Sequence, residues 1–152
     1  MTFESIMAEI KAAQYKPVYF LMGDEPFFID AITDYLIAHV LPESEKAFNQ
    51  LILYGRDTDM GTIISSARKY PMMATRQLIV VREAQHLKNM EGLESYLSAP
   101  QTTTVLVFAY KYKKIDKRTK LAKVLGEKSV FFDSEPIRED KVPSWVMDHM
   151  NS

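Results

Sequence analysis

The sequence predicts an α/β domain of three layers, in which helices cover both faces of a mostly parallel five-stranded sheet. Two observations lead to this prediction. Short apolar runs alternate with segments of about 10–15 residues whose apolar side chains have helical spacing. Runs such as 78–81 and 103–109 are apolar almost throughout, as in strands that are buried on both faces. Right-handed crossovers between such strands give a parallel sheet with helices on each face.

Each expected element has a local signal. Apolar residues at helical spacing predict a short amphipathic helix over residues 3–13. A second helix begins after Pro26 and is closed by Pro42, and a third is capped by Asp57 or Asp59. The expected strands are 18–22, 49–54, 77–81, 103–109 and 129–132. Further helical segments are expected around Leu87, over 93–97 and, with a basic face, over about 116–125.

A domain boundary is expected near Pro136. Residues 1–135 then form one domain, and residues 136–152 form a linker and the first helix of a following helical domain. That helix, which carries Trp145 and Val146, stops almost as soon as it begins. The chain is therefore expected to be a fragment of a longer protein.

The composition narrows the class of protein. The chain is 47% hydrophobic and 26% charged, which is typical of a globular domain and not of a disordered chain. A formal net charge of -1 argues neither for nor against nucleic acid. The absence of cysteine excludes disulfides, thiolate metal sites and a cysteine nucleophile. No signal peptide or membrane-spanning run is found, so a cytoplasmic protein is expected.

The glycine turn after the first strand has the shape of a phosphate-binding loop but lacks its chemistry. Such a loop needs a lysine for the phosphates and Ser or Thr for magnesium. Phe28, Ile29 and Asp30 stand at those positions. Asp24 and Glu25 place two carboxylates at the start of the helix, where they would repel phosphate. The residues favour a helix start without nucleotide; a diverged nucleotide site is the alternative.

Other catalytic signals are weak. The third strand ends like a magnesium-binding strand of an ATPase, but Arg82 replaces the aspartate and Glu83 alone is a poor signal. The three histidines share no spacing of the kind that binds metal. No catalytic residue, metal or cofactor is therefore expected.

Two stretches remain as candidate contact surfaces, and the first is basic. Residues 111–123 contain seven Lys or Arg residues and one Asp, a local charge of +6. This segment is either a solvated helix face or a contact to a nucleic-acid backbone through Lys113, Lys114, Lys117 and Arg118.

The second stretch is the loop Tyr70-Pro71-Met72-Met73, which precedes the third strand. Its two methionines follow a proline that stops a helix, so they lie on no periodic apolar stripe. They are either tucked into the core or exposed as an adaptable apolar contact surface.

Three segments together resemble one known family. K-P-V-Y-F-L-M-G-D-E-P-F-F-I, Y-P-M-M-A-T-R-Q-L-I-V-V and V-P-S-W-V occur in this order and resemble the delta subunit of the bacterial DNA polymerase III clamp loader. The resemblance spans essentially the whole chain. It implies an ATPase-like domain of the P-loop NTPase (AAA+/RecA-like) kind that binds no ATP, within the DNA polymerase III holoenzyme. The alternative is a nucleotide-dependent NTPase with a diverged phosphate loop.

The resemblance also implies partners and a contact site. Its partners would be the sliding clamp (beta subunit), which it helps to open for loading onto DNA, and the delta prime and tau/gamma subunits of the loader. DNA would be contacted indirectly or through the full loader. Met72 and Met73, with Tyr70 and Pro71 before them, correspond to the clamp-binding segment, in which family members often have Leu-Phe.

Overall fold

The computed structural model describes residues 1–135, and the expected linker and helix at 136–152 lie outside this part. The strands are β1 (Val18–Gly23), β2 (Gln50–Tyr54), β3 (Gln77–Arg82), β4 (Thr104–Lys111) and β5 (Val130–Ser134). The helices are α1 (Phe3–Lys11), α2 (Pro26–His39), α3 (Glu43–Asn49), α4 (Met60–Ala67), α5 (Leu93–Ser98) and α6 (Lys120–Lys128), with short 3-10 turns η1 (Ala84–His86) and η2 (Met90–Gly92). No helix in this part of the chain is long and apolar enough to cross a membrane.

The five strands form one sheet in the order β2-β3-β4-β1-β5, and every neighbouring pair is parallel. β1 lies inside the sheet, where Leu21 is beside Ala109 of β4 and Phe132 of β5. All six residues of β1 are buried. The predicted parallel five-stranded sheet is confirmed.

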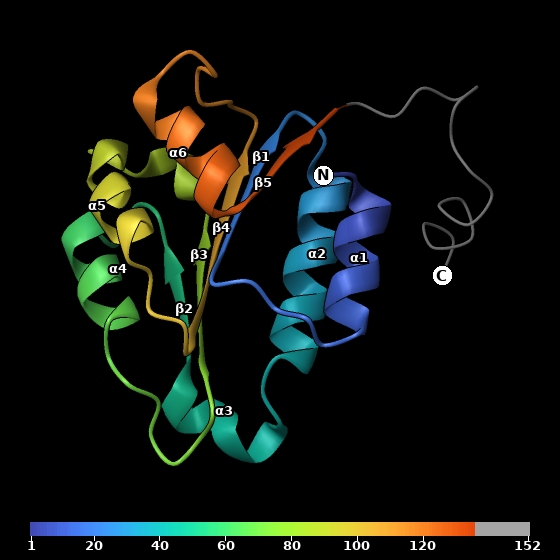
Figure 1. The fold of residues 1–152 in the computed structure, drawn as a ribbon, viewed down its shortest axis with the longest axis vertical. Helices are drawn as coiled ribbons and strands as arrows, with labels where there is room; N and C mark the ends of the chain where they lie inside the picture. Colours follow the sequence, from blue (N-terminus) through green and yellow to red (C-terminus); the bar gives the residue numbers. More distant parts are fainter. Residues whose placement is uncertain (136–152) are drawn as a thin grey trace.

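Helices cover both faces of the sheet, as Figure 1 shows: α1 and α2 on one side and α4, α5 and α6 on the other. A hydrophobic core lies on each face of the sheet, and successive side chains of β1 point alternately into one core and the other. Tyr19 and Leu21 pack with the α1 and α2 side, whereas Phe20 and Met22 pack with the α4, α5 and α6 side. The three-layer arrangement predicted from the sequence is therefore present.

Capping side chains determine where several helices begin. The Thr2 hydroxyl accepts from the Ser5 N–H, and the Thr119 hydroxyl accepts from the Ala122 N–H. The Asp59 carboxylate accepts from the Thr62 N–H at 2.7 Å, which lowers the pKa of that carboxyl. Asp59, and not Asp57, is thus the N-cap of α4.

Two expectations about helices are wrong. Pro42 was expected to close a helix, but α2 ends at His39 and Pro42 is the residue from which α3 starts. The basic helix was expected over about 116–125, but α6 begins only at Lys120 because Thr119 caps it. The basic residues before Thr119 therefore lie in a loop.

Candidate functional site

The strongest candidate surface is the loop between α4 and β3, residues 70–76, which we call the tip. It lies at the amino ends of the strands, beside α3, at the bottom of Figure 1. In a parallel sheet this is the edge opposite the one where α/β proteins usually bind their ligands.

The two methionines of the tip are exposed. Met72 is 63% and Met73 101% exposed, and Tyr70 before them is 78% exposed. Pro71 is half-buried. Of the two possibilities left by the sequence, core burial is therefore excluded for this pair. Adjacent exposed methionines form a flexible, polarisable apolar surface that can adapt to a partner.

A side chain from a distant part of the sequence fixes the backbone at Met72. Asn49, the last residue of α3, is 4% exposed. Its Oδ1 accepts from the Met72 N–H at 2.7 Å, and its Nδ2 donates to the Met72 carbonyl at 2.9 Å. Nδ2 also lies 3.3 Å from the Glu45 carbonyl oxygen within α3.

The base of the tip is fixed as well. The Gln77 side-chain amide donates to the carbonyls of Ser66 and Lys69, at 3.0 and 2.8 Å, and so ties the end of α4 to the start of β3. It also donates to the Thr104 hydroxyl at 2.9 Å. The Arg76 guanidinium lies over the ring of Tyr15, 4.9 Å from its centroid.

Met73 has a left-handed backbone, with φ of 53°. This conformation is uncommon for a residue with a long side chain and costs about 1–3 kcal/mol. It turns the chain at the point where the Met73 side chain is fully exposed. The surrounding hydrogen bonds must hold the tip in this conformation.

A third apolar side chain joins this surface and was not expected from the sequence. Phe48 of α3 is 73% exposed. A shallow groove of about 270 Å³ is lined by Ser44, Glu45, Phe48, Asn49, Met72 and Met73. Phe48 is an aromatic residue in the otherwise polar run E-S-E-K-A-F-N-Q, which was the available signal.

Three backbone N–H groups of the turn after β1 already donate to groups of the same chain. The N–H groups of Asp24 and Glu25 donate to the Ser134 carbonyl at 3.1 and 3.4 Å, and the Phe27 N–H donates to the Glu25 carboxylate at 3.0 Å. Gly23 has φ of 127°, and a Cβ there would lie 2.2 Å from the Ser134 oxygen. Ser134 of β5 thus lies directly against the turn and accepts two of the N–H groups that a phosphate loop would direct to its ligand.

The basic segment is largely neutralised by carboxylates of the same chain. Lys114 forms ion pairs with Asp133 at 3.0 Å and Glu135 at 2.8 Å, and Lys117 pairs with Asp133 at 2.9 Å. The hydrogen bond to Glu135, followed by that to Asp133, raises the pKa of Lys114. These two lysines therefore offer less free charge than the sequence indicates.

The other two basic candidates differ from one another. Arg118 pairs with Asp116 at 2.8 Å, whereas Lys113 is exposed and has no ion-pair partner among residues 1–135. The structure brings none of these cations to the tip, which lies at the opposite edge of the sheet.

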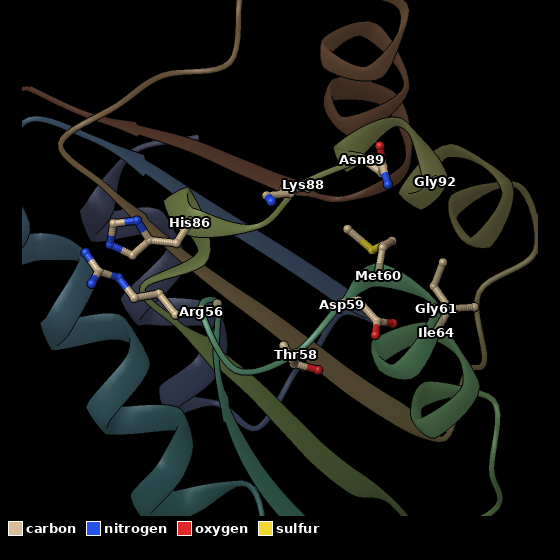
Figure 2. Close-up of a pocket in the computed structure, with 11 residues that line it drawn as sticks. Arg56, Thr58, Asp59, Met60, Gly61, Ile64, His86, Lys88, Asn89 and Gly92 are labelled. Atoms are coloured by element: carbon tan, nitrogen blue, oxygen red, sulfur yellow. The ribbon is translucent and has the colours of Figure 1, made fainter.

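A separate cleft of about 640 Å³ lies beyond the carboxyl ends of β2 and β3. Figure 2 shows Arg56 and His86 at one end of it and Asn89 at the other. Asp59 also lines the cleft, but its carboxylate already caps α4. Residues 1–135 contain no group of His, Asp or Glu side chains that could hold a metal ion.

Comparisons with known proteins agree on one family. The family described as "DNA polymerase III, delta subunit" matches residues 19–135. The chain is 24% identical to DNA polymerase III subunit delta of Bacillus subtilis (strain 168), over 97% of this chain and 45% of that protein.

Solved structures show the same fold. The DNA clamp loader delta protein of Bacillus subtilis superimposes with a TM-score of 0.84 and 22% identity, over 97% of this chain and 46% of that one. A DNA polymerase III gamma subunit-related protein of Thermotoga maritima gives a TM-score of 0.59 and 14% identity, over 92% and 48%. The chain therefore spans about half the length of the relatives that it matches.

Proposed function

The chain belongs to the DNA polymerase III delta-subunit family, and from this premise we propose that it is the clamp-binding part of a clamp-loader subunit. In this proposal the tip docks in an apolar cleft of the sliding clamp, with Met72 and Met73 inserted and Tyr70 and Pro71 at the margin. The proposal also includes association with delta prime and tau/gamma subunits, and contact with DNA through the assembled loader.

One observation carries the proposal: two adjacent methionines are exposed on a loop whose backbone is held at both ends. Burying one such side chain contributes about 1.5–3 kcal/mol. Because the loop is already ordered by Asn49 and Gln77, little conformational entropy is lost on docking. Unbranched methionine side chains fit a cleft that accepts Leu or Phe with a modest loss of packing.

Phe48 extends the proposed surface beyond the two residues that correspond to the family's contact segment. It belongs to α3 and lines the same shallow groove as Met72 and Met73. We expect it to contact the clamp at the edge of the same cleft, since aromatic side chains are enriched at interface contacts.

A non-catalytic subunit can help to open a ring only by binding the open form more tightly than the closed form. A ligand shifts an equilibrium by its differential affinity for the two states and by no more. The proposed role therefore requires that the tip surface gain contacts, or relieve strain, when the clamp interface opens. Nucleotide hydrolysis is then left to other subunits, which fits the filled turn after β1.

The test is a clamp-binding series on this chain. Changing Met72 and Met73 to Ala should weaken binding to the sliding clamp by roughly 3 kcal/mol, about a hundredfold in Kd. Phe48→Ala should have a smaller effect in the same direction. Tyr54→Ala is the matched control, because Tyr54 is 49% exposed but lies at the far end of β2.

Melting temperature separates an effect on contact from an effect on folding. Since both methionines are exposed, their replacement should leave Tm almost unchanged, whereas buried methionines would cost roughly 2–5 kcal/mol each. Wild-type clamp affinity in the double variant would overturn the proposed function.

A further inference from the structure

The two hydrogen bonds between the Asn49 side chain and the Met72 main chain, which we call the clasp, hold the backbone of the tip. Asn49 uses both its acceptor and its donor on the main chain of one residue, 23 positions away in the sequence. We propose that Asn49 is the positioning residue of the tip, which holds it in the docking conformation before any partner arrives. This inference rests on the proposed function and concerns the same surface.

The chemistry of the clasp requires an amide. One planar group must accept from the Met72 N–H and donate to the Met72 carbonyl, and only the side chains of Asn and Gln carry both functions in this arrangement. Aspartate keeps the acceptor but places a second oxygen against the carbonyl. Nδ2 also faces the Glu45 carbonyl oxygen, so the amide orientation is determined by two carbonyls.

The clasp acts at the residue before the strained turn. Met73 has the left-handed backbone, and Met72 immediately before it is the residue that Asn49 holds. Without the clasp, a short exposed loop with two apolar side chains would relax toward more favourable backbone angles and would cover those side chains. The bound conformation would then be only one of several.

The position of Asn49 also links the tip to Phe48. Asn49 ends α3 and is followed directly by β2, so its backbone is fixed by a helix on one side and by the sheet on the other. Phe48 is its neighbour and lines the groove together with Met72 and Met73. The buried amide therefore connects α3, which carries Phe48, to the loop that carries Met72 and Met73.

The expected size of the effect follows from the population of the docking conformation. Apparent Kd rises by the reciprocal of the fraction of molecules that are competent to bind. If the freed tip is competent in about one molecule in ten, Asn49→Ala weakens clamp binding about tenfold without removing any contact side chain. Asn49→Asp should weaken binding at least as much as Asn49→Ala, because it places a buried carboxylate oxygen against the carbonyls of Met72 and Glu45.

The experiment measures clamp Kd, Tm and amide hydrogen exchange in this chain. In Asn49→Ala, the Met72 amide should lose protection while the amides of β3 and β4 keep theirs. Gln85→Ala is the matched control, because the buried Gln85 amide accepts from the Lys111 N–H at 3.1 Å and so holds a distant backbone at the carboxyl end of β4, away from the tip. The control should leave clamp affinity and Met72 protection unchanged.

Repeating the Asn49→Ala change in a second protein, the double methionine variant, distinguishes positioning from a general structural role. In the variant with both methionines changed to Ala, adding Asn49→Ala should weaken clamp binding little further, because the side chains that it positions are gone. An additive tenfold loss there would overturn the inference, and so would wild-type affinity of Asn49→Ala together with an unprotected Met72 amide. If Asn49→Ala does not fold, the uncharged variant Asn49→Ser carries the same three measurements.

The two proposals fail in different ways. Normal clamp binding by the double methionine variant contradicts the proposed function, and the loss of a docking conformation then has no partner to affect. Normal binding by Asn49→Ala, with weak binding by the double methionine variant, contradicts only the positioning role.

Discussion

Asp133 is a half-buried carboxylate on the edge strand β5, and it forms ion pairs with two lysines, Lys114 and Lys117. Burial by itself would raise the pKa of this carboxyl, but the hydrogen bonds and charges of Lys117 and Lys114 outweigh burial and lower it. The carboxylate is therefore more acidic in the folded chain than in the unfolded one. Its ionised form stabilises the fold, and protonation removes that contribution.

The pH dependence of stability should report this carboxylate. Because its folded pKa is below its unfolded value of about 4, the stabilisation is complete above that pH and is lost as pH falls through the folded pKa. The free energy of unfolding of wild type should exceed that of Asp133→Asn by about 1 kcal/mol at pH 7, and the difference should shrink below about pH 4. Urea unfolding of both proteins between pH 7 and pH 3 measures this difference.

A partner variant tests the cause. Lys114→Gln removes one of the two cations that lower the pKa of Asp133, so its loss of stability should begin at a higher pH than in wild type. Stability curves for wild type and Asp133→Asn that stay parallel across the whole range would contradict the assignment.

At the residue scale, local patterns predicted positions but not exposure. The proline before Met72 and Met73 placed the pair in a loop, yet burial and exposure both remained open. The deciding contact comes from Asn49, which is distant in the sequence and belongs to a helix that was not expected. No local spacing encodes such a contact, so the clasp could not be predicted, whereas the exposed Phe48 had one local signal, an aromatic residue in a polar run.

At the scale of elements, strands were predicted well because each is a continuous apolar run. α3 was missed because Pro42 was interpreted as a helix terminator, although proline is equally acceptable at a helix start. The start of α6 was placed too early because charge alone does not distinguish a basic loop from a basic helix. The cap at Thr119, a local signal, gives the correct start.

The loop before α6 carries a prediction about DNA. We expect Lys113 to contribute more to a contact with a DNA backbone than Lys114 or Lys117, because those two already pair with Asp133. In the assembled loader, Lys113→Gln should reduce the slope of log K against log salt by roughly one unit, and Lys114→Gln or Lys117→Gln by less.

Lys11→Gln serves as the control for this series, since Lys11 ends α1 on the other face of the sheet. Its slope should equal that of wild type. If wild type and all four variants give the same slope, the basic segment is a solvated surface and makes no backbone contact.

At the scale of the molecule, the two ends of the parallel strands differ in whether they offer an exposed contact surface. At the carboxyl ends of the strands, the N–H groups of Asp24 and Glu25 in the turn after β1 donate to the Ser134 carbonyl. The amino edge carries the exposed tip. The fold is thus shared with a clamp-loader relative, while the surface proposed for contact is far from the turn that would hold a nucleotide.

This arrangement predicts that the chain binds no ATP. Calorimetry with ATP and magnesium should give no heat beyond dilution, because the N–H groups of Asp24, Glu25 and Phe27 already have acceptors and the lysine is missing. Addition of ATP should also leave the affinity of the tip for the clamp unchanged. A stoichiometric site with micromolar affinity would contradict the prediction and would favour the diverged NTPase.

The position of β1 between β4 and β5 affects the timing of folding during synthesis. Its two partners in the sheet are β4, which begins at Thr104, and β5, which begins at Val130. At a translation rate of roughly 5–20 residues per second, the six apolar residues of β1 wait several seconds for either neighbour. β1 must therefore leave the ribosome before either of its partner strands, and the hydrogen bonds of the turn after it form only when Ser134 has been synthesised.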